Sequence, residues 1–70
     1  MSEPDASVQT VAFVILVEEA HREALLRDLL DLAERGQDVS EVLAELWRTD
    51  NSLAALRERR AHLKTRRRDH

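Results

Sequence analysis

Two pairs of acidic and histidine side chains have a spacing that could bind a metal ion. Glu18 and His21 are three residues apart, as are the glutamate and histidine that one helix offers to a di-iron centre. Glu58 and His62 share a helix face, and a hairpin folded at Gly36 would bring both pairs to the same half of a bundle. A di-iron site needs more inward-facing carboxylates than these leucine-rich helices offer. We therefore interpret both pairs as surface contacts and expect no metal and no cofactor.

Basic side chains concentrate at the end of the chain, although its net charge is -3. Residues 1–36 hold three basic and eight acidic residues, whereas residues 37–70 hold eight basic and six acidic ones. Seven of those bases form the basic tail: Arg57, Arg59, Arg60, Lys64, Arg66, Arg67 and Arg68. A basic arm binds polyanions through salt-dependent contacts that ignore sequence. The alternative is a solvated helix end, where cations suit the negative end of the helix dipole.

No motif of the sequence supports catalysis or a membrane location. There is no His–Asp–Ser arrangement, P-loop or glycine-rich signature, so we expect no enzyme and no catalytic residue. The apolar run over residues 11–17 is far shorter than the ~20 residues that span a bilayer. Glu3 and Asp5 precede it in place of the basic residues that begin a signal peptide. We expect a cytoplasmic protein that does not contact a membrane.

The size of the chain predicts an oligomer. A domain of 70 residues buries only ~60% of the surface that its unfolded chain exposes, so its own core is marginal. Chains this short usually depend on disulfides, a metal or a partner subunit. The sequence has no cysteine, and we expect no metal. A homodimer or a higher oligomer is therefore the predicted state.

Leucine spacing and capping residues predict two helices joined at a glycine. The first helix covers about residues 18–35, and Gly36 is its natural left-handed cap. Asp38 is a good N-cap for a second helix over about residues 39–64. The polar residues 49–52 favour caps over helix interiors, so they predict either a bend or a fresh helix start.

Apolar residues of the second helix recur at helical spacing and predict its buried face. We expect this stripe, together with apolar residues near the N-terminus, to form the core and the dimer interface. Trp47 should pack there, because one tryptophan buries a large area. The predicted interface residues are Val11, Phe13, Ile15, Val42, Leu46, Trp47, Leu53, Leu56 and Leu63.

Residues 8–17 fit two different secondary structures. Their many β-branched side chains favour a strand. Helical spacing also places Val8, Val11 and Ile15 on one side, and no Gly or Pro separates them from the next helix. A helix that is apolar on all sides must be buried on all sides, which is difficult in a small protein. We therefore favour a strand paired with its copy at the centre of a dimer, with a helix extension as the alternative.

The segment LAERGQDVSEVLAEL resembles the ribbon-helix-helix family of small dimeric repressors and antitoxins. The matching residues are Leu32, Ala33, Gly36, Ser40, Glu41, Val42, Leu43 and Leu46. The following segment, NSLAALRERRAHL, resembles the charged tail with which antitoxins wrap their toxin. The resemblance implies that two chains pair their N-terminal strands and lay them in the DNA major groove. Backbone amides at the start of the second helix would hold a phosphate.

Two functions follow from this resemblance and from the basic tail. The first is a small dimeric DNA-binding regulator of the antitoxin or repressor type, whose C-terminal helix contacts a protein partner. Its predicted nucleic-acid-binding residues are Gln9, Thr10, Ser40, Arg57, Arg60, Lys64 and Arg67. The alternative is a helical-hairpin interaction or assembly module without nucleic-acid binding. Asp38 favours the alternative, since the family commonly has Ser or Thr there and a carboxylate repels phosphate.

The predicted fold class is mainly α. A short N-terminal strand, or a helix extension, precedes an antiparallel helix-turn-helix hairpin in a dimer. Residues 1–7 are a flexible N-terminal arm, residues 8–65 are a single small helical domain, and residues 66–70 are a frayed basic tail. The predicted partner is a second copy of the chain, with DNA and a partner protein at the C-terminal helix as further candidates.

Overall fold

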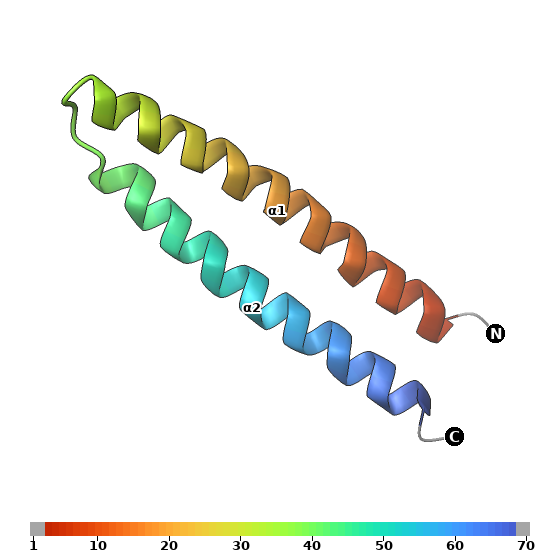
Figure 1. Cartoon of the computed structure of the whole chain (residues 1–70). Coiled ribbons are helices and arrows are strands. Elements are labelled where there is room, and N and C mark those ends of the chain that lie inside the picture. The colour runs from red at the N-terminus through yellow and green to blue at the C-terminus, as the bar shows by residue number, and fades with distance from the viewer. Residues whose placement is uncertain (1–2, 69–70) are drawn as a thin grey trace.

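The chain forms an antiparallel hairpin of two long helices (Figure 1). The computed structural model describes the backbone of residues 3–68 and the side chains of residues 7–65. Helix α1 is Glu3–Glu34 and helix α2 is Ser40–Arg68, and the described residues include no strand. The hairpin measures 55 × 15 × 12 Å, and both termini lie at the end opposite the loop. The predicted helical hairpin is confirmed.

Residues 8–17 are helical, so the strand that we favoured for them is wrong and the helix extension is correct. Val11 and Ile15 are 9% and 3% exposed because they pack against α2 within the same chain. Strand propensity is worth little when packing favours a helix, and no Gly or Pro interrupts the helical backbone here. α1 also includes residues 3–7, which we had placed in an N-terminal arm.

The loop between the helices follows from two local signals. Gly36 has φ +71°, which only glycine adopts without strain. The amide of Gly36 donates to the carbonyl of Ala33 (3.0 Å), and the amide of Gln37 donates to that of Leu32 (2.9 Å). This pair of bonds is the Schellman motif that ends a helix at a left-handed residue. The predicted glycine cap of α1 is therefore present.

Helix α2 begins at a side-chain cap and continues without a break. Asp38 accepts hydrogen bonds from the amide of Ser40 (3.0 Å) and from its hydroxyl (2.7 Å). The bend that we predicted at residues 49–52 is absent. Thr49 keeps the helix intact because its hydroxyl donates to the carbonyl of Glu45 (2.9 Å), four residues back.

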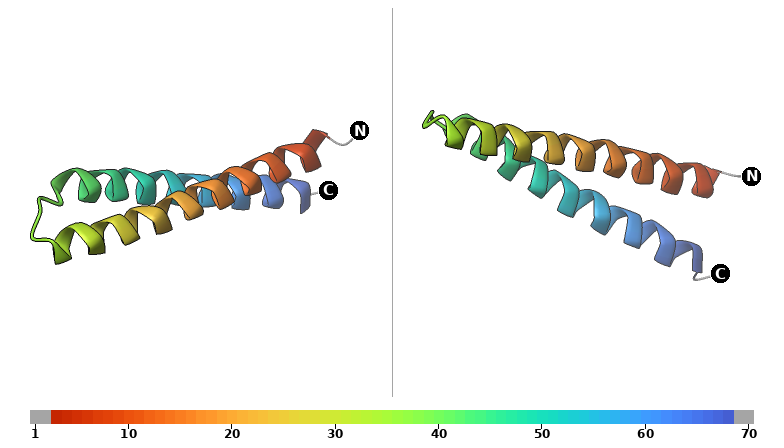
Figure 2. Two further views of the ribbon diagram at one scale, coloured as in Figure 1. Left: turned by 90° about the horizontal axis from the view of Figure 1, so that it is seen from above. Right: turned by 45° about the horizontal axis from the view of Figure 1, so that its top comes forward.

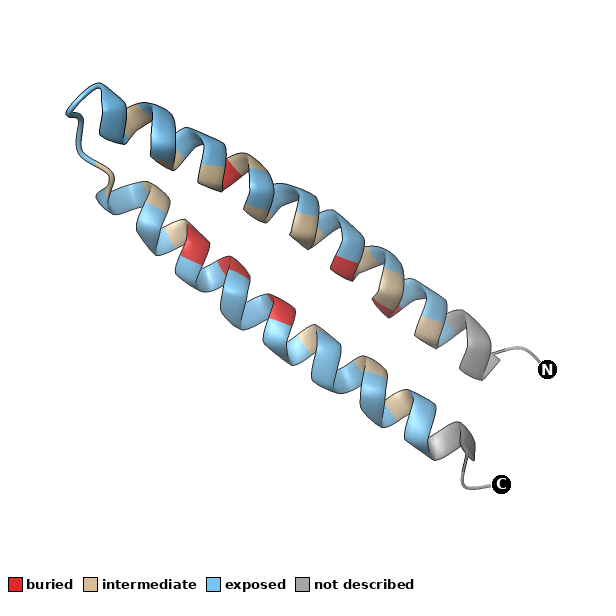
Figure 3. Cartoon of the chain, viewed as in Figure 1, coloured by how far each residue is buried: buried red, intermediate tan, exposed pale blue. Residues whose placement is uncertain are grey.

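The helices meet along a seam in which positions alternate three and four residues apart. In α1 these positions are Val8, Val11, Ile15, Glu18, Arg22, Leu25, Leu29 and Leu32. On the other side they are Val39, directly before α2, and the α2 residues Val42, Leu46, Thr49, Leu53, Leu56, Arg60 and Leu63. All sixteen are buried or half-buried (Figure 3). A mean spacing of 3.5 residues is the pattern of a coiled coil, so the hairpin is a short antiparallel coiled coil.

The two helices lie side by side, and no further element of residues 3–68 packs on them (Figure 2). Among residues 7–65, five apolar residues are buried: Val11, Ile15, Leu25, Leu46 and Leu53. The accessible surface is 5554 Å², whereas a compact monomer of 8.1 kDa exposes about 4,500 Å². The radius of gyration is 16.2 Å, against about 11 Å for a compact chain of this length. The hairpin alone is therefore an open structure with one thin core.

Candidate interaction surface

The face of α1 that points away from α2 carries a continuous apolar strip. We define this outer strip as Phe13, Leu16, Val17, Ala20 and Ala24. Phe13 is 65% exposed, Leu16 64% and Val17 49%, while Ala20 is exposed and Ala24 half-buried. Four of its members lie two residues after a seam position, which is about 200° around the helix. The hairpin itself therefore cannot cover the strip.

A second apolar cluster lies near the loop, on one flank of the hairpin. We define this loop-end patch as Leu30, Leu43 and Trp47, which are 65%, 49% and 69% exposed. Each of them follows a seam position by one residue. Because the helices are antiparallel, residues one after the seam on both helices point to the same side of the hairpin. The patch therefore spans both helices.

The nine predicted interface residues fall into two groups. Seven lie in the seam within one chain, either buried or half-buried: Val11, Ile15, Val42, Leu46, Leu53, Leu56 and Leu63. Phe13 and Trp47 are exposed and available to a partner. Sequence reasoning missed Leu16 and Val17 as surface residues because it favoured a strand at residues 8–17, and it did not single out Leu30 within the first predicted helix. Once the seam positions are known, the spacing of these three residues from the nearest seam position shows that they are on the surface.

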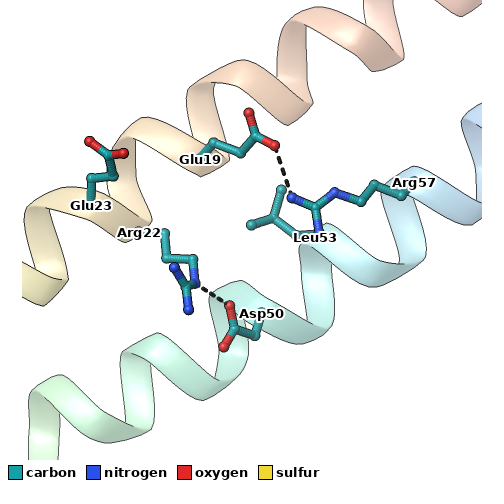
Figure 4. A pocket seen from close by; sticks show the side chains of 6 residues that line it. All are labelled: Glu19, Arg22, Glu23, Asp50, Leu53 and Arg57. Atoms are coloured by element: carbon teal, nitrogen blue, oxygen red, sulfur yellow. Dashed lines mark hydrogen bonds and ion pairs between the residues drawn. The ribbon is translucent and has the colours of Figure 1, made fainter.

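A charged groove occupies the middle of the flank that carries the loop-end patch (Figure 4). Nε of Arg22 lies 2.6 Å from Oδ1 of Asp50, and Nη2 of Arg57 lies 2.9 Å from Oε2 of Glu19. Both ion pairs join α1 to α2 above Leu53, which is 2% exposed. Arg57, which we predicted to bind nucleic acid, is thus paired with an acidic residue of its own chain. The groove combines both signs of charge and offers no single-sign field for a polyanion.

The opposite flank holds a contact between a histidine and an acid. Nε2 of His21 lies 3.5 Å from Oε2 of Glu45, across the two helices. A hydrogen bond from Arg48 and then one from His21 lower the pKa of Glu45 below its ordinary value. No three His, Asp or Glu side chains of the described part gather as metal ligands. The acidic partner of His21 is thus Glu45 of α2, whereas we had paired His21 with Glu18.

Among the predicted nucleic-acid-binding residues that the structure describes, Ser40 lies apart from the others, which are towards the open end of the hairpin. Gln9 and Thr10 are exposed near the open end of the hairpin, and Ser40 lies at the loop end. Arg60 is half-buried in the seam and Lys64 is exposed, while the side chain of Arg67 lies outside the described residues. Ser40 is bonded to Asp38, and these bonds lower the pKa of that carboxyl.

The carboxylate at the start of α2 decides how that helix end interacts with anions. Asp38 carries a negative charge near the first amides of α2, and its pKa is lowered by hydrogen bonds from the hydroxyl and then the amide of Ser40. It therefore stays ionised across the neutral range. A phosphate approaching these amides would meet that charge. The helix start is consequently occupied by a group of the chain itself.

Comparisons with family models, with curated proteins and with solved structures found no match to this chain. No helix of the described residues has an apolar stretch of the length that a bilayer requires. The outer strip and the loop-end patch are therefore the features on which a function can be argued.

Proposed function

We propose that this chain is a helical-hairpin assembly module that acts by self-association and needs no nucleic acid. The observation that carries this proposal is the uncovered apolar surface. In the part of the chain whose side chains the structure describes, six large apolar residues are about half exposed or more: Phe13, Leu16, Val17, Leu30, Leu43 and Trp47. Apolar clusters of this kind, rimmed by charge, are typical of protein–protein contacts.

The area of the hairpin supports the same proposal. Its surface exceeds that of a compact monomer by about 1,000 Å². A standard interface buries about 800 Å² on each partner. The excess therefore matches the area that one partner of the same size would remove from water. Pairing two hairpins gives a four-helix arrangement, in which each helix has a neighbour on more than one side.

The assembly module replaces the DNA-binding regulator as the function we propose, and DNA binding stays a prediction. The regulator's DNA contact depends on a paired N-terminal strand, and residues 8–17 are helical. Arg57 is paired with Glu19, and Asp38 occupies the start of α2. The remaining basic residues allow salt-sensitive contacts with a polyanion. Such contacts are a weaker basis for a function than the exposed apolar surface.

Sedimentation velocity over a wide range of chain concentrations tests the proposal. We expect a mass of two chains or a multiple, which falls to one chain on dilution. A chain that stays monomeric at high concentration would refute self-association. A parallel titration of labelled mixed-sequence duplex DNA at low salt tests the alternative. Strong binding that weakens steeply with added salt would favour the regulator over the assembly module.

A further inference from the structure

We infer that a second copy of this chain docks on the outer strip of α1, antiparallel to it, around a two-fold axis. This inference rests on the proposed self-association and assigns it a surface. None of the five residues of the strip is charged, although α1 is rich in acids and the exposed Glu23, three residues after Ala20, borders the strip. Glu18 and Arg22 are seam positions, half-buried towards α2, and so they leave the strip free for an apolar contact.

The side-chain sizes along the strip are complementary to their own reversed order. The four members that lie two residues after a seam position decrease in size along the helix and end in two alanines: Phe13, Val17, Ala20 and Ala24. In an antiparallel pair, Phe13 meets Ala24 of the second copy and Val17 meets Ala20 of the second copy. Both contacts arise from one alignment of the two helices, so a single two-fold axis produces both. Each contact then occurs twice, once on either side of the axis. Each large side chain then fills the space that a small one leaves.

A parallel pair would lack this match. Phe13 would meet Phe13 and Ala24 would meet Ala24, so the helices would be forced apart at one end and leave a gap at the other. Alanines at two layers of the antiparallel pair instead allow the backbones to approach closely. The large aromatic ring contributes most of the buried area. The antiparallel register is therefore the favoured one.

The ends of the strip are polar. Gln9 and Arg27 continue the strip on either side, and both are exposed. In the register that pairs Phe13 with Ala24, Gln9 of one copy is level with Asp28 of the second copy, and Arg27 of that copy is within one residue of the same level, at both ends of the contact. The amide oxygen of glutamine accepts hydrogen bonds, and the guanidinium of arginine donates them. The apolar contact thus ends in a polar rim, as interfaces generally do.

A pair of matched charge substitutions tests the docking face. Ala20→Glu places a carboxylate at the centre of the strip, whereas Ala54→Glu places one on the exposed face of α2. Both sites are exposed in the hairpin, so both variants should keep the helical circular dichroism of the wild type. We expect Ala20→Glu to raise the dissociation constant about 100-fold or more, because the charge would be buried unpaired. Ala54→Glu should leave it within about threefold.

Cysteine cross-linking tests the register, since the natural chain has no cysteine. Chains with Phe13→Cys and chains with Ala24→Cys, one set carrying a mass tag, are mixed and oxidised. We expect disulfides between the two kinds of chain. Each kind alone should stay uncross-linked, since like cysteines are separated by about 16 Å along the antiparallel pair.

The outcomes separate the docking face from self-association itself. Loss of assembly in Ala54→Glu but not in Ala20→Glu would overturn the strip as the docking face while self-association stands. Disulfides between like chains would overturn the antiparallel register. A wild-type chain that is monomeric at every concentration would refute both the proposed function and this inference.

Discussion

Leu53 gives the sharpest test of the seam, because it is the most deeply buried side chain of the hairpin. It is 2% exposed and packs with Val11 and Ile15, residues that we had favoured as a strand. Leu53→Ala would remove a buried isobutyl group and leave a cavity between the helices. Buried leucine-to-alanine changes cost about 2–5 kcal/mol. The open hairpin can collapse in part, so we expect a loss of about 2–3 kcal/mol.

That loss is large beside the total stability of the chain. A domain of 70 residues is stable by about 3.5–10 kcal/mol, and each kcal/mol shifts the melting temperature by about 4–8 °C. Leu53→Ala should therefore melt at least about 8 °C below the wild type. The assay is urea and thermal unfolding followed by circular dichroism at 222 nm, at one fixed chain concentration, since association adds to apparent stability.

Leu30→Ala is the matched control for this prediction. The same atoms are removed from a side chain that is 65% exposed and outside the seam. Because Leu30 belongs to the loop-end patch, the two variants are compared at a chain concentration low enough to keep the protein monomeric. The free energy of unfolding of Leu30→Ala should change by less than about 0.5 kcal/mol. Equal losses in the two variants would show that Leu53 is not inside the seam, and the pairing of α1 with α2 would then have to be rejected.

Three further predictions concern the loop and the charged contacts. Gly36→Ala should cost about 1–2 kcal/mol in urea unfolding, because φ is +71° while a new Cβ meets no neighbour. Arg57→Ala should cost less than about 1 kcal/mol, a loss that added salt reduces, since its ion pair with Glu19 is about half exposed. Glu45→Gln should melt below the wild type at neutral pH. Because the pKa of Glu45 is lowered, its contribution is present above the ordinary carboxyl pKa and is lost as the pH falls through the lowered pKa, so the two melting temperatures should converge on acidification.

The local features of the fold could be predicted because each depends on neighbours in the sequence. Gly36 supplies the left-handed residue that ends α1, and Asp38 bonds to Ser40 at the start of α2. The bend predicted at residues 49–52 was wrong because Thr49 bonds back to Glu45 instead of breaking the helix. A polar side chain in a helix has both options, and packing of the flanking leucines selects between them.

The N-terminal helix was harder to predict because polar residues interrupt its seam. Val8, Val11 and Ile15 continue through Glu18 and Arg22 to the leucines, at an unbroken alternation of three and four residues. Arg22 is tolerated there because its guanidinium reaches Asp50 at the edge of α2. Because these two charged residues interrupt the apolar pattern, the sequence did not show that residues 8–17 and the later leucines share one seam. Local propensity then gave the wrong answer for residues 8–17.

The apolar run over residues 11–17 contains its own evidence for a second interface. Seven consecutive residues go almost twice around a helix, so no single neighbouring helix can cover them all. α2 covers Val11 and Ile15, and it leaves Phe13, Leu16 and Val17 exposed. A strand dimer was one way to bury this run on all sides. A helix that packs on α2 with one face and on a second copy with the other meets the same requirement with the backbone that the structure has.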